Sequence, residues 1–301
     1  MSTHAAHPLS AFQIWFLAIR PKIMSAAIAP VVVGTGVAIH EDGFVWWIAA
    51  LALITAILLQ IASNLANDAI DAKKGTDTHE RTGPMRLTAS GYVTYRQMMN
   101  ATYISLALAM VTGLPLIIYG GWIYVALGIA AMLSALAYTG GPFPISYLGL
   151  GEVFVFLFFG LVAVTGTAYL QTGELTALSL AASIPPGALI VAILIVNNYR
   201  DRPQDEVAGK RTVAVRIGAR NTRIQFYLML LATALSPLVF WALGWMNAWA
   251  LITLLAWPML WQLAQQIRTL HGPALNRTLG ATSKTVLVHS LLLAAALILS
   301  N

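Results

Sequence analysis

The sequence predicts an all-α, polytopic membrane protein with nine transmembrane helices, and three observations support this fold class. Of the 301 residues, 58% are hydrophobic and 9% are charged, whereas soluble domains carry about 25% charged residues. The apolar residues gather into segments that can each cross a bilayer as a helix of about 20 residues. All 17 Lys and Arg residues fall on one side of the resulting arrangement.

The predicted spans follow one another with short connections, apart from two longer polar loops at 72–96 and 199–221. The glycines at 120 and 121 indicate a tight hairpin between the third and fourth spans. No linker interrupts the pattern, so we expect residues 1–301 to form a single transmembrane domain. The approximate bounds of the nine spans are 23–39, 45–67, 97–119, 121–139, 148–170, 177–198, 222–243, 247–267 and 283–300.

The basic residues predict the orientation of the chain. They occupy the stretches 20–22, 73–96, 200–223 and 268–284, which all lie on the same side of nine spans. By the positive-inside rule this side, and the N-terminus with it, faces the cytoplasm. The net charge of +6 therefore reflects topology, and nucleic-acid binding is not expected. The absence of Cys excludes disulfides and thiolate metal sites.

The first of two acidic stretches, NLANDAIDAKKGTD at 64–77, ends the second span. At 100° per residue, Asn64, Asp68 and Asp71 fall on one face of a helix, and Asn67 lies nearby. Carboxylates are costly at the edge of a bilayer, so they need a function there. Because carboxylate and amide oxygens suit Mg²⁺, this face is predicted to bind that cation.

The second acidic stretch, NNYRDRPQDEVAGKRT at 197–212, ends the sixth span and has the same order of residue types. Asn197, Asp201 and Asp205 repeat every four residues, which places them near one another on a helix. Pro203 is expected to break or restart that helix, which leaves the place of Asp205 open. We predict that both stretches face each other across a bundle and hold Mg²⁺ together.

Basic residues beside Mg²⁺ ligands point to a polyanion, and a diphosphate would use all of these groups. An oily tail on the diphosphate would explain a site at a membrane edge. Ordinary solvated interface residues and an ion-coupled transporter are the alternatives, although transporters place their acids nearer the middle of a span. The residues predicted to bind the diphosphate are Asn64, Asn67, Lys73, Arg81, Arg86, Asn197, Asn198, Lys210 and Arg211.

The two acidic stretches resemble the aspartate-rich motifs of the UbiA-type intramembrane prenyltransferases. RPKIMSAAIAPVVVGTG at 20–36, ERTGPMRLTASG at 80–91 and AYTGGPFPISYLGLGEVFVFLFFG at 137–160 are similar to segments of the 1,4-dihydroxy-2-naphthoate polyprenyltransferase branch. The resemblance covers most of residues 20–220. The loop between the fourth and fifth spans lacks the basic residues of the 4-hydroxybenzoate branch, which argues against that acceptor.

The resemblance implies a central cavity, with the site at its cytoplasmic mouth and the loops 72–96 and 199–221 as a cap. It also implies a bacterial inner membrane enzyme of menaquinone synthesis. The expected reaction moves a polyprenyl group from an allylic polyprenyl diphosphate to 1,4-dihydroxy-2-naphthoate, releasing diphosphate and CO₂ and giving demethylmenaquinol. Other acceptors of the superfamily, such as 4-hydroxybenzoate, haem or homogentisate, are the closest alternatives. The Mg²⁺ ligands implied are Asp68, Asp71, Asp201 and Asp205.

Three further residues are candidates for binding the acceptor. Lys22 follows a proline at the start of the first span and is predicted to bind the acceptor carboxylate, although it could be an ordinary positive-inside anchor. Tyr138 could line the aromatic pocket and stabilise a cation through its ring, or simply pack. Glu152 could orient Lys22 or a phenol, or act as a solvated helix end.

Overall fold

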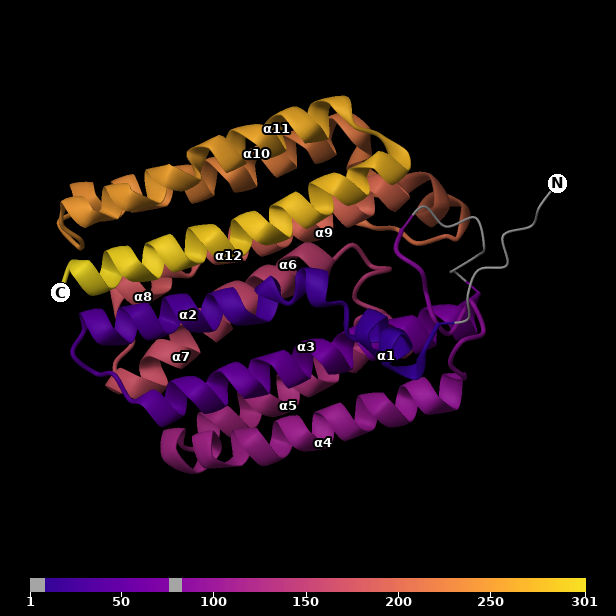
Figure 1. The fold of residues 1–301 in the computed structure, drawn as a ribbon, viewed down its shortest axis with the longest axis horizontal. Helices are drawn as coiled ribbons and strands as arrows, with labels where there is room; N and C mark the ends of the chain where they lie inside the picture. The colour runs from indigo at the N-terminus through magenta and orange to yellow at the C-terminus, as the bar shows by residue number, and fades with distance from the viewer. Residues whose placement is uncertain (1–8, 76–82) are drawn as a thin grey trace.

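The computed structural model describes residues 9–75 and 83–301, and this part of the chain is helical with no strand. The long helices run roughly parallel to one another in one bundle (Figure 1), which confirms the predicted all-α class. The α-helices are α1 (Ala11–Ile19), α2 (Ser25–His40), α3 (Trp46–Lys74), α4 (Tyr95–Gly120), α5 (Trp122–Ala137), α6 (Gly151–Val155), α7 (Ala163–Thr172), α8 (Ala177–Ala182), α9 (Ile184–Val207), α10 (Val213–Ala242), α11 (Trp257–Thr269) and α12 (Leu275–Leu299). Three short 3-10 helices, η1 (Pro21–Ile23), η3 (Ala248–Ala256) and η4 (Gly272–Ala274), and one π-helix, η2 (Phe156–Val162), complete the set.

Six helical segments of the described chain are long and apolar enough to cross a membrane. A seventh arises if the pair Ala11–Ile23 and Ser25–His40, bent by 49°, counts as one span. The other two predicted spans correspond to α5, which has only 16 residues, and to η3 followed by α11. Nine spans with a cytoplasmic N-terminus therefore stay a proposal.

The second acidic stretch is more helical than expected. The prediction that Pro203 breaks the helix is wrong, because α9 continues through Pro203 to Val207. Proline removes one helical hydrogen bond and crowds the preceding turn, but here only one further turn follows, so little is lost. Most of the predicted loop 199–221 belongs to α9 and α10, which residues 208–212 separate. Helix α10 is itself interrupted within this stretch at Gly218, whose φ of 75° is not helical.

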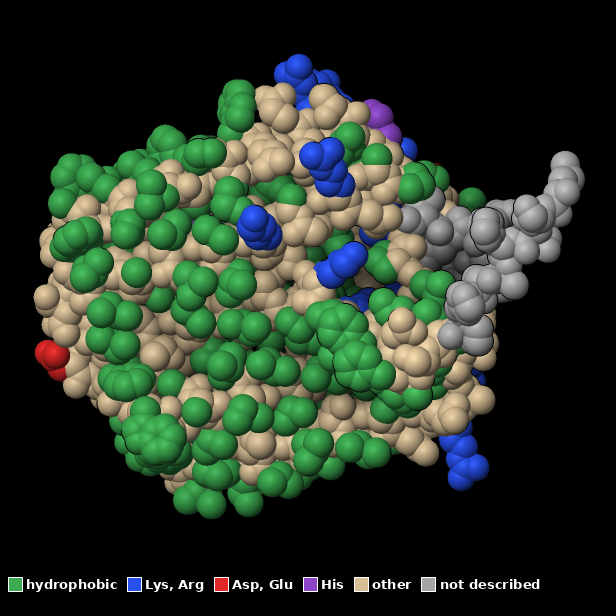
Figure 2. Space-filling view, viewed as in Figure 1, with side chains coloured by type: hydrophobic (Ala, Val, Ile, Leu, Met, Phe, Trp, Pro, Cys, Tyr) green, Lys and Arg blue, Asp and Glu red, His purple; other side chains and the backbone are tan. Residues whose placement is uncertain are grey.

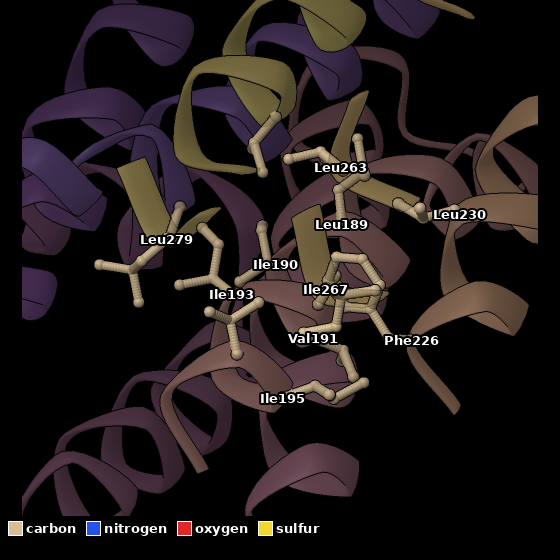
Figure 3. Packing of buried hydrophobic residues seen from close by; sticks show 14 of the residues in the cluster. Leu189, Ile190, Val191, Ile193, Ile195, Phe226, Leu230, Leu263, Ile267 and Leu279 are labelled. Atoms are coloured by element: carbon tan, nitrogen blue, oxygen red, sulfur yellow. The ribbon is translucent and has the colours of Figure 1, made fainter. Parts of the chain in front are cut away.

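Helix α9 lies at the centre of the packing because its span is apolar on every face. Leu189, Ile193 and Ile195 of α9 pack with Phe226 of α10 and Leu263 of α11 in one buried cluster (Figure 3). This surrounding core fixes α9, and thereby the acidic residues at its C-terminal end.

One contact between α9 and the π-helix η2 is made by backbone alone. A Cβ added to Gly187 would lie 2.9 Å from the Cα of Gly160, and the reverse addition would give the same distance. Such a separation is shorter than real Cβ contacts show, so any side chain at either position would force the two helices apart.

Hydrophobic and basic side chains occupy different parts of the visible surface (Figure 2). Hydrophobic side chains cover much of the visible face, whereas Lys and Arg lie on the half that contains α1, away from the C-terminal end of α12. This distribution agrees with the expectation that the basic residues border one side of a membrane.

Candidate active site

A cavity of about 830 Å³ lies between α2, α3, α4, α5, α9 and the segment η2–α7. Its walls are mainly aliphatic and aromatic along α4 and α5, and polar side chains gather where α3 and α9 end. The polar and charged residues that line this end include Arg20, Asn64, Asn67, Asp71, Arg86, Tyr138, Thr139, Asn197, Asn198, Asp201, Asp205 and Lys210. Both acidic stretches therefore meet at one cavity.

The two acids of the first stretch have different partners. Asp71 is buried on the cavity wall and forms an ion pair with Arg86, whose Nη2 lies 3.4 Å from Oδ2. Asp68 accepts the backbone N–H of Leu87 on Oδ2 at 3.2 Å and that of Thr88 on Oδ1 at 2.9 Å. It is not among the residues that line the cavity in the described chain. Asp68 thus anchors the segment 86–88 to α3, and this anchoring brings Arg86 to Asp71.

The two amides of the first stretch line the cavity and also connect α3 to its neighbours. Asn64 donates from Nδ2 to the carbonyl oxygen of Ile19 at 3.0 Å, which ties α3 to the end of α1. Asn67 accepts the hydroxyl of Thr139 on Oδ1 at 3.0 Å, which ties α3 to the chain after α5.

In the second stretch Asp201 is held by its own neighbour. Arg200 donates from Nε and Nη2 to the two carboxylate oxygens of Asp201, each at 2.7 Å. The remaining Nη1 donates to Oδ1 of Asn276 on α12, also at 2.7 Å. Asp205 lies one turn further along α9, and its Oδ1 is 3.9 Å from Nζ of Lys210.

The predicted acceptor residues lie at different depths. Tyr138 lines the cavity, and its hydroxyl would be 3.1 Å from a Cβ placed on Gly151. Glu152 is buried behind the lining and accepts Nδ2 of Asn198 at 3.1 Å. Glu152 therefore acts on the cavity through the amide of Asn198.

The structure does not bring every predicted residue to the cavity. The side chains of Lys22, Lys73 and Arg211 are exposed and are not part of the described lining. Lys73 instead places Nζ 5.0 Å from the ring centroid of Tyr95. Arg81 lies outside the described residues.

Sequence reasoning missed a junction between the two stretches. Nζ of Lys74 donates to the carbonyl oxygen of Thr139 at 2.6 Å and lies 4.7 Å from the ring centroid of Tyr147. Nζ of Lys210 lies 5.4 Å from the same centroid. Tyr147 thus contacts one lysine from each acidic stretch. Helical spacing could have selected Lys74, because it follows Asp71 by three residues and shares its face, whereas Lys73 does not.

The donor set fits a hard divalent cation shared with an anionic ligand. Within residues 9–75 and 83–301, no three Asp, Glu or His side chains form a ready-made metal cluster. Carboxylates of Asp71, Asp201 and Asp205 nevertheless line the same cavity, together with several amide oxygens. Mg²⁺ in proteins typically takes one or two carboxylates and completes its shell with water and substrate phosphate.

Comparison with known families identifies relatives over almost the whole chain. The model of the UbiA prenyltransferase family matches residues 27–299. The 1,4-dihydroxy-2-naphthoate octaprenyltransferase of Mycobacterium tuberculosis is 39% identical over 96% of this chain and 98% of its own length. The Escherichia coli protein of the same name is 35% identical over 97% of both chains.

A solved structure has the same fold. The UbiA homologue from Archaeoglobus fulgidus, determined with GPP and Mg²⁺, superimposes with a TM-score of 0.66 over 94% of this chain and 99% of its own. Its sequence identity is only 15%, so the likeness concerns the fold alone.

Proposed function

Because the chain belongs to the UbiA prenyltransferase family, we propose that it transfers a polyprenyl group from an allylic polyprenyl diphosphate to 1,4-dihydroxy-2-naphthoate. The reaction releases diphosphate and CO₂ and gives demethylmenaquinol, a step of menaquinone synthesis. The observation that carries this proposal is the 35–39% identity to three relatives named 1,4-dihydroxy-2-naphthoate octaprenyltransferase, over at least 96% of this chain.

The cavity suits a ligand with an anionic head and an apolar tail. Its polar end presents the cations of Arg86 and Lys210, and such groups bind phosphate oxygens through charge-assisted hydrogen bonds. Its walls along α4 and α5 are apolar, with Leu114, Ile117 and Met132 among the lining residues. We place the diphosphate between the two acidic stretches and the polyprenyl tail along α4 and α5.

Mg²⁺ would neutralise the diphosphate when bound and so make it a better leaving group. Asp71, Asp201 and Asp205 would hold the cation, since all three line the cavity, with Asn64 and Asn197 assisting. That Asp68 is a fourth ligand stays a prediction, because both of its oxygens here accept backbone N–H groups.

The chemistry needs no covalent enzyme intermediate. The allylic C–O bond breaks, its electron pair leaves with the diphosphate, and the prenyl C1 becomes electron-deficient. A ring carbon of the naphthoate then forms the new C–C bond. The carboxyl group on that carbon leaves as CO₂, and its bonding pair restores the aromatic ring. Arg86 and Lys210 would stabilise the charge that develops on the leaving group, which is often a dominant catalytic contribution.

Two side chains of the wall would act on the acceptor. The ring of Tyr138 lines the cavity, where its face can stabilise the electron-deficient prenyl carbon. For the acceptor carboxylate, Lys22 stays a prediction. Arg20, two residues earlier, is a cation that does line the cavity.

We also propose nine spans in a bacterial inner membrane, with the N-terminus and the site facing the cytoplasm. The basic half of the molecule in Figure 2 and the positive-inside rule support this orientation. Reporter fusions at Asp42 and Gln171 test it, because alkaline phosphatase should be active at both positions.

The acceptor assay tests the reaction. Purified protein is incubated with Mg²⁺, an allylic polyprenyl diphosphate and carboxyl-labelled 1,4-dihydroxy-2-naphthoate, and we expect labelled CO₂ and a prenylated naphthoquinol. 4-Hydroxybenzoate and homogentisate serve as competing acceptors and should give no product. Prenylation of either competitor without any naphthoate product would overturn the proposed acceptor.

A further inference from the structure

Arg200 links the second acidic stretch to the C-terminal helix α12. Its guanidinium uses Nε and Nη2 for Asp201 and Nη1 for Asn276, and all three hydrogen bonds are 2.7 Å long. Asn276 belongs to the first turn of α12, far along the chain from either acidic stretch.

The pairing of Arg200 with Asp201 is unusual, because the side chains of adjacent residues on a helix do not normally face each other. Arg200 nevertheless turns back onto Asp201, and its side chain is only 1% exposed. A buried guanidinium is costly unless its donors are satisfied. The side-chain Oδ1 of Asn276 accepts from Nη1, the guanidinium nitrogen that does not bond Asp201.

The contact with Arg200 fixes the orientation of the Asp201 carboxylate. A bidentate pair fixes the carboxylate plane as well as its position. Each carboxylate oxygen accepts one hydrogen bond from Arg200, and a carboxylate oxygen can bind more than one partner at a time. Asp201 lines the cavity, whereas Asn276 does not line it within the described chain.

We propose that Asn276 is a positioning residue that, through Arg200, holds the Asp201 carboxylate in the orientation in which it binds the divalent cation. The inference rests on the proposed function, since it takes Asp201 as a cation ligand. Outer-shell partners of this kind typically change metal affinity by about 10- to 100-fold when they are removed.

A matched pair of variants tests the inference. Asn276→Leu keeps the approximate shape of the side chain but has no acceptor, so the purified variant should bind Mn²⁺, measured by electron paramagnetic resonance, about 10-fold more weakly. Its half-saturating Mg²⁺ concentration in the prenyl-transfer assay should rise in parallel. Asn276→Asp keeps an acceptor oxygen and should stay within about 2-fold of the original protein.

Asn221→Leu is the control, because Asn221 is exposed and its amide donates to the backbone of Ile217, four residues earlier. Thermal unfolding checks that each variant is folded, and Asn276→Ala replaces the Leu variant if the latter is not. Unchanged Mn²⁺ affinity in the Leu or Ala variant would overturn the inference, and so would an equal loss in the Asp variant. A parent protein that neither binds Mn²⁺ nor needs Mg²⁺ would instead refute the proposed function, and this inference with it.

Discussion

The two acidic stretches have similar sequences but are held in different ways. In the first, the partners of Asp68 and Asp71 come from the segment 86–88, across a connection to another part of the chain. In the second, Asp201 is bound by its neighbour Arg200, and Asp205 lies near Lys210 just after the same helix.

In the described chain, the contacts of the first acidic stretch cross a connection between α3 and α4, whereas those of Asp201 lie within α9 and lead on to α12. The ion pair between Asp71 and Arg86 forms only when residues 86–88 lie against α3. The carboxylate of Asp201 is fixed by α9 and α12 themselves.

The largest effect is expected when a cavity carboxylate loses its charge. Asp71→Asn and Asp201→Asn should each lower kcat/KM for prenyl transfer by at least about 100-fold, because transition-state charge stabilisation is lost. Chelation of Mg²⁺ should abolish activity in the parent protein. Full activity in either variant would show that only one stretch binds the cation.

Asp68→Asn should have a smaller effect that is specific to the first stretch. The amide has only one acceptor oxygen, and its NH₂ group would face the other backbone N–H. One of the hydrogen bonds from Leu87 and Thr88 is therefore lost, at a cost of about 1–3 kcal/mol. Hydrogen exchange should accelerate at Leu87 and Thr88 and stay unchanged in α9. Protection that is equal in variant and parent would contradict the anchoring role of Asp68.

Glu152→Gln should reduce activity by about 3- to 10-fold, since replacing the charged acceptor by a neutral one weakens the hydrogen bond by about 1 kcal/mol. Without the carboxylate, the amide of Asn198 can turn and present its nitrogen to the cavity. The KM for the prenyl diphosphate or the acceptor, measured separately, reports which ligand Asn198 contacts. Glu174→Gln is the control, because Glu174 is exposed and lies just beyond the end of α7.

The smallest effect distinguishes two neighbouring lysines. Lys74→Ala should raise the KM for the prenyl diphosphate about 3-fold, because Lys74 bonds Thr139 and lies over Tyr147, and partly exposed cation–π contacts are worth about 0.5–1 kcal/mol. Lys73→Ala should leave that KM unchanged. The reverse order would place Lys73 at the diphosphate.

The sequence was sufficient for what depends on composition and helical spacing. Apolar segment lengths predict the helices, and the spacing of the four aspartates predicts acids that share one face of each helix. The lining of the described chain contains Asp71, Asp201 and Asp205 but not Asp68. The resemblance, more than the spacing, selects the reaction.

What the sequence could not predict depends on contacts between distant segments. The bonds from Leu87 and Thr88 to Asp68 arise only once the chain folds back on α3. Nothing in the local sequence of Asn276 distinguishes it from the generic polar residues near a span. Lys22 was predicted from its position after a proline, but side-chain direction at the break between α1 and α2 depends on tertiary packing.

The close approach of Gly160 and Gly187 sets the angle of α9 relative to η2 at a point far from the cation site. Asp201 lies 14 residues beyond Gly187 on the same helix, which corresponds to about 21 Å at 1.5 Å per residue. A tilt of about 5° at the glycine contact would displace the carboxylate by about 2 Å over that length. A methyl group at Gly187 would therefore displace the Asp201 carboxylate and weaken cation binding without contacting any ligand of the cation.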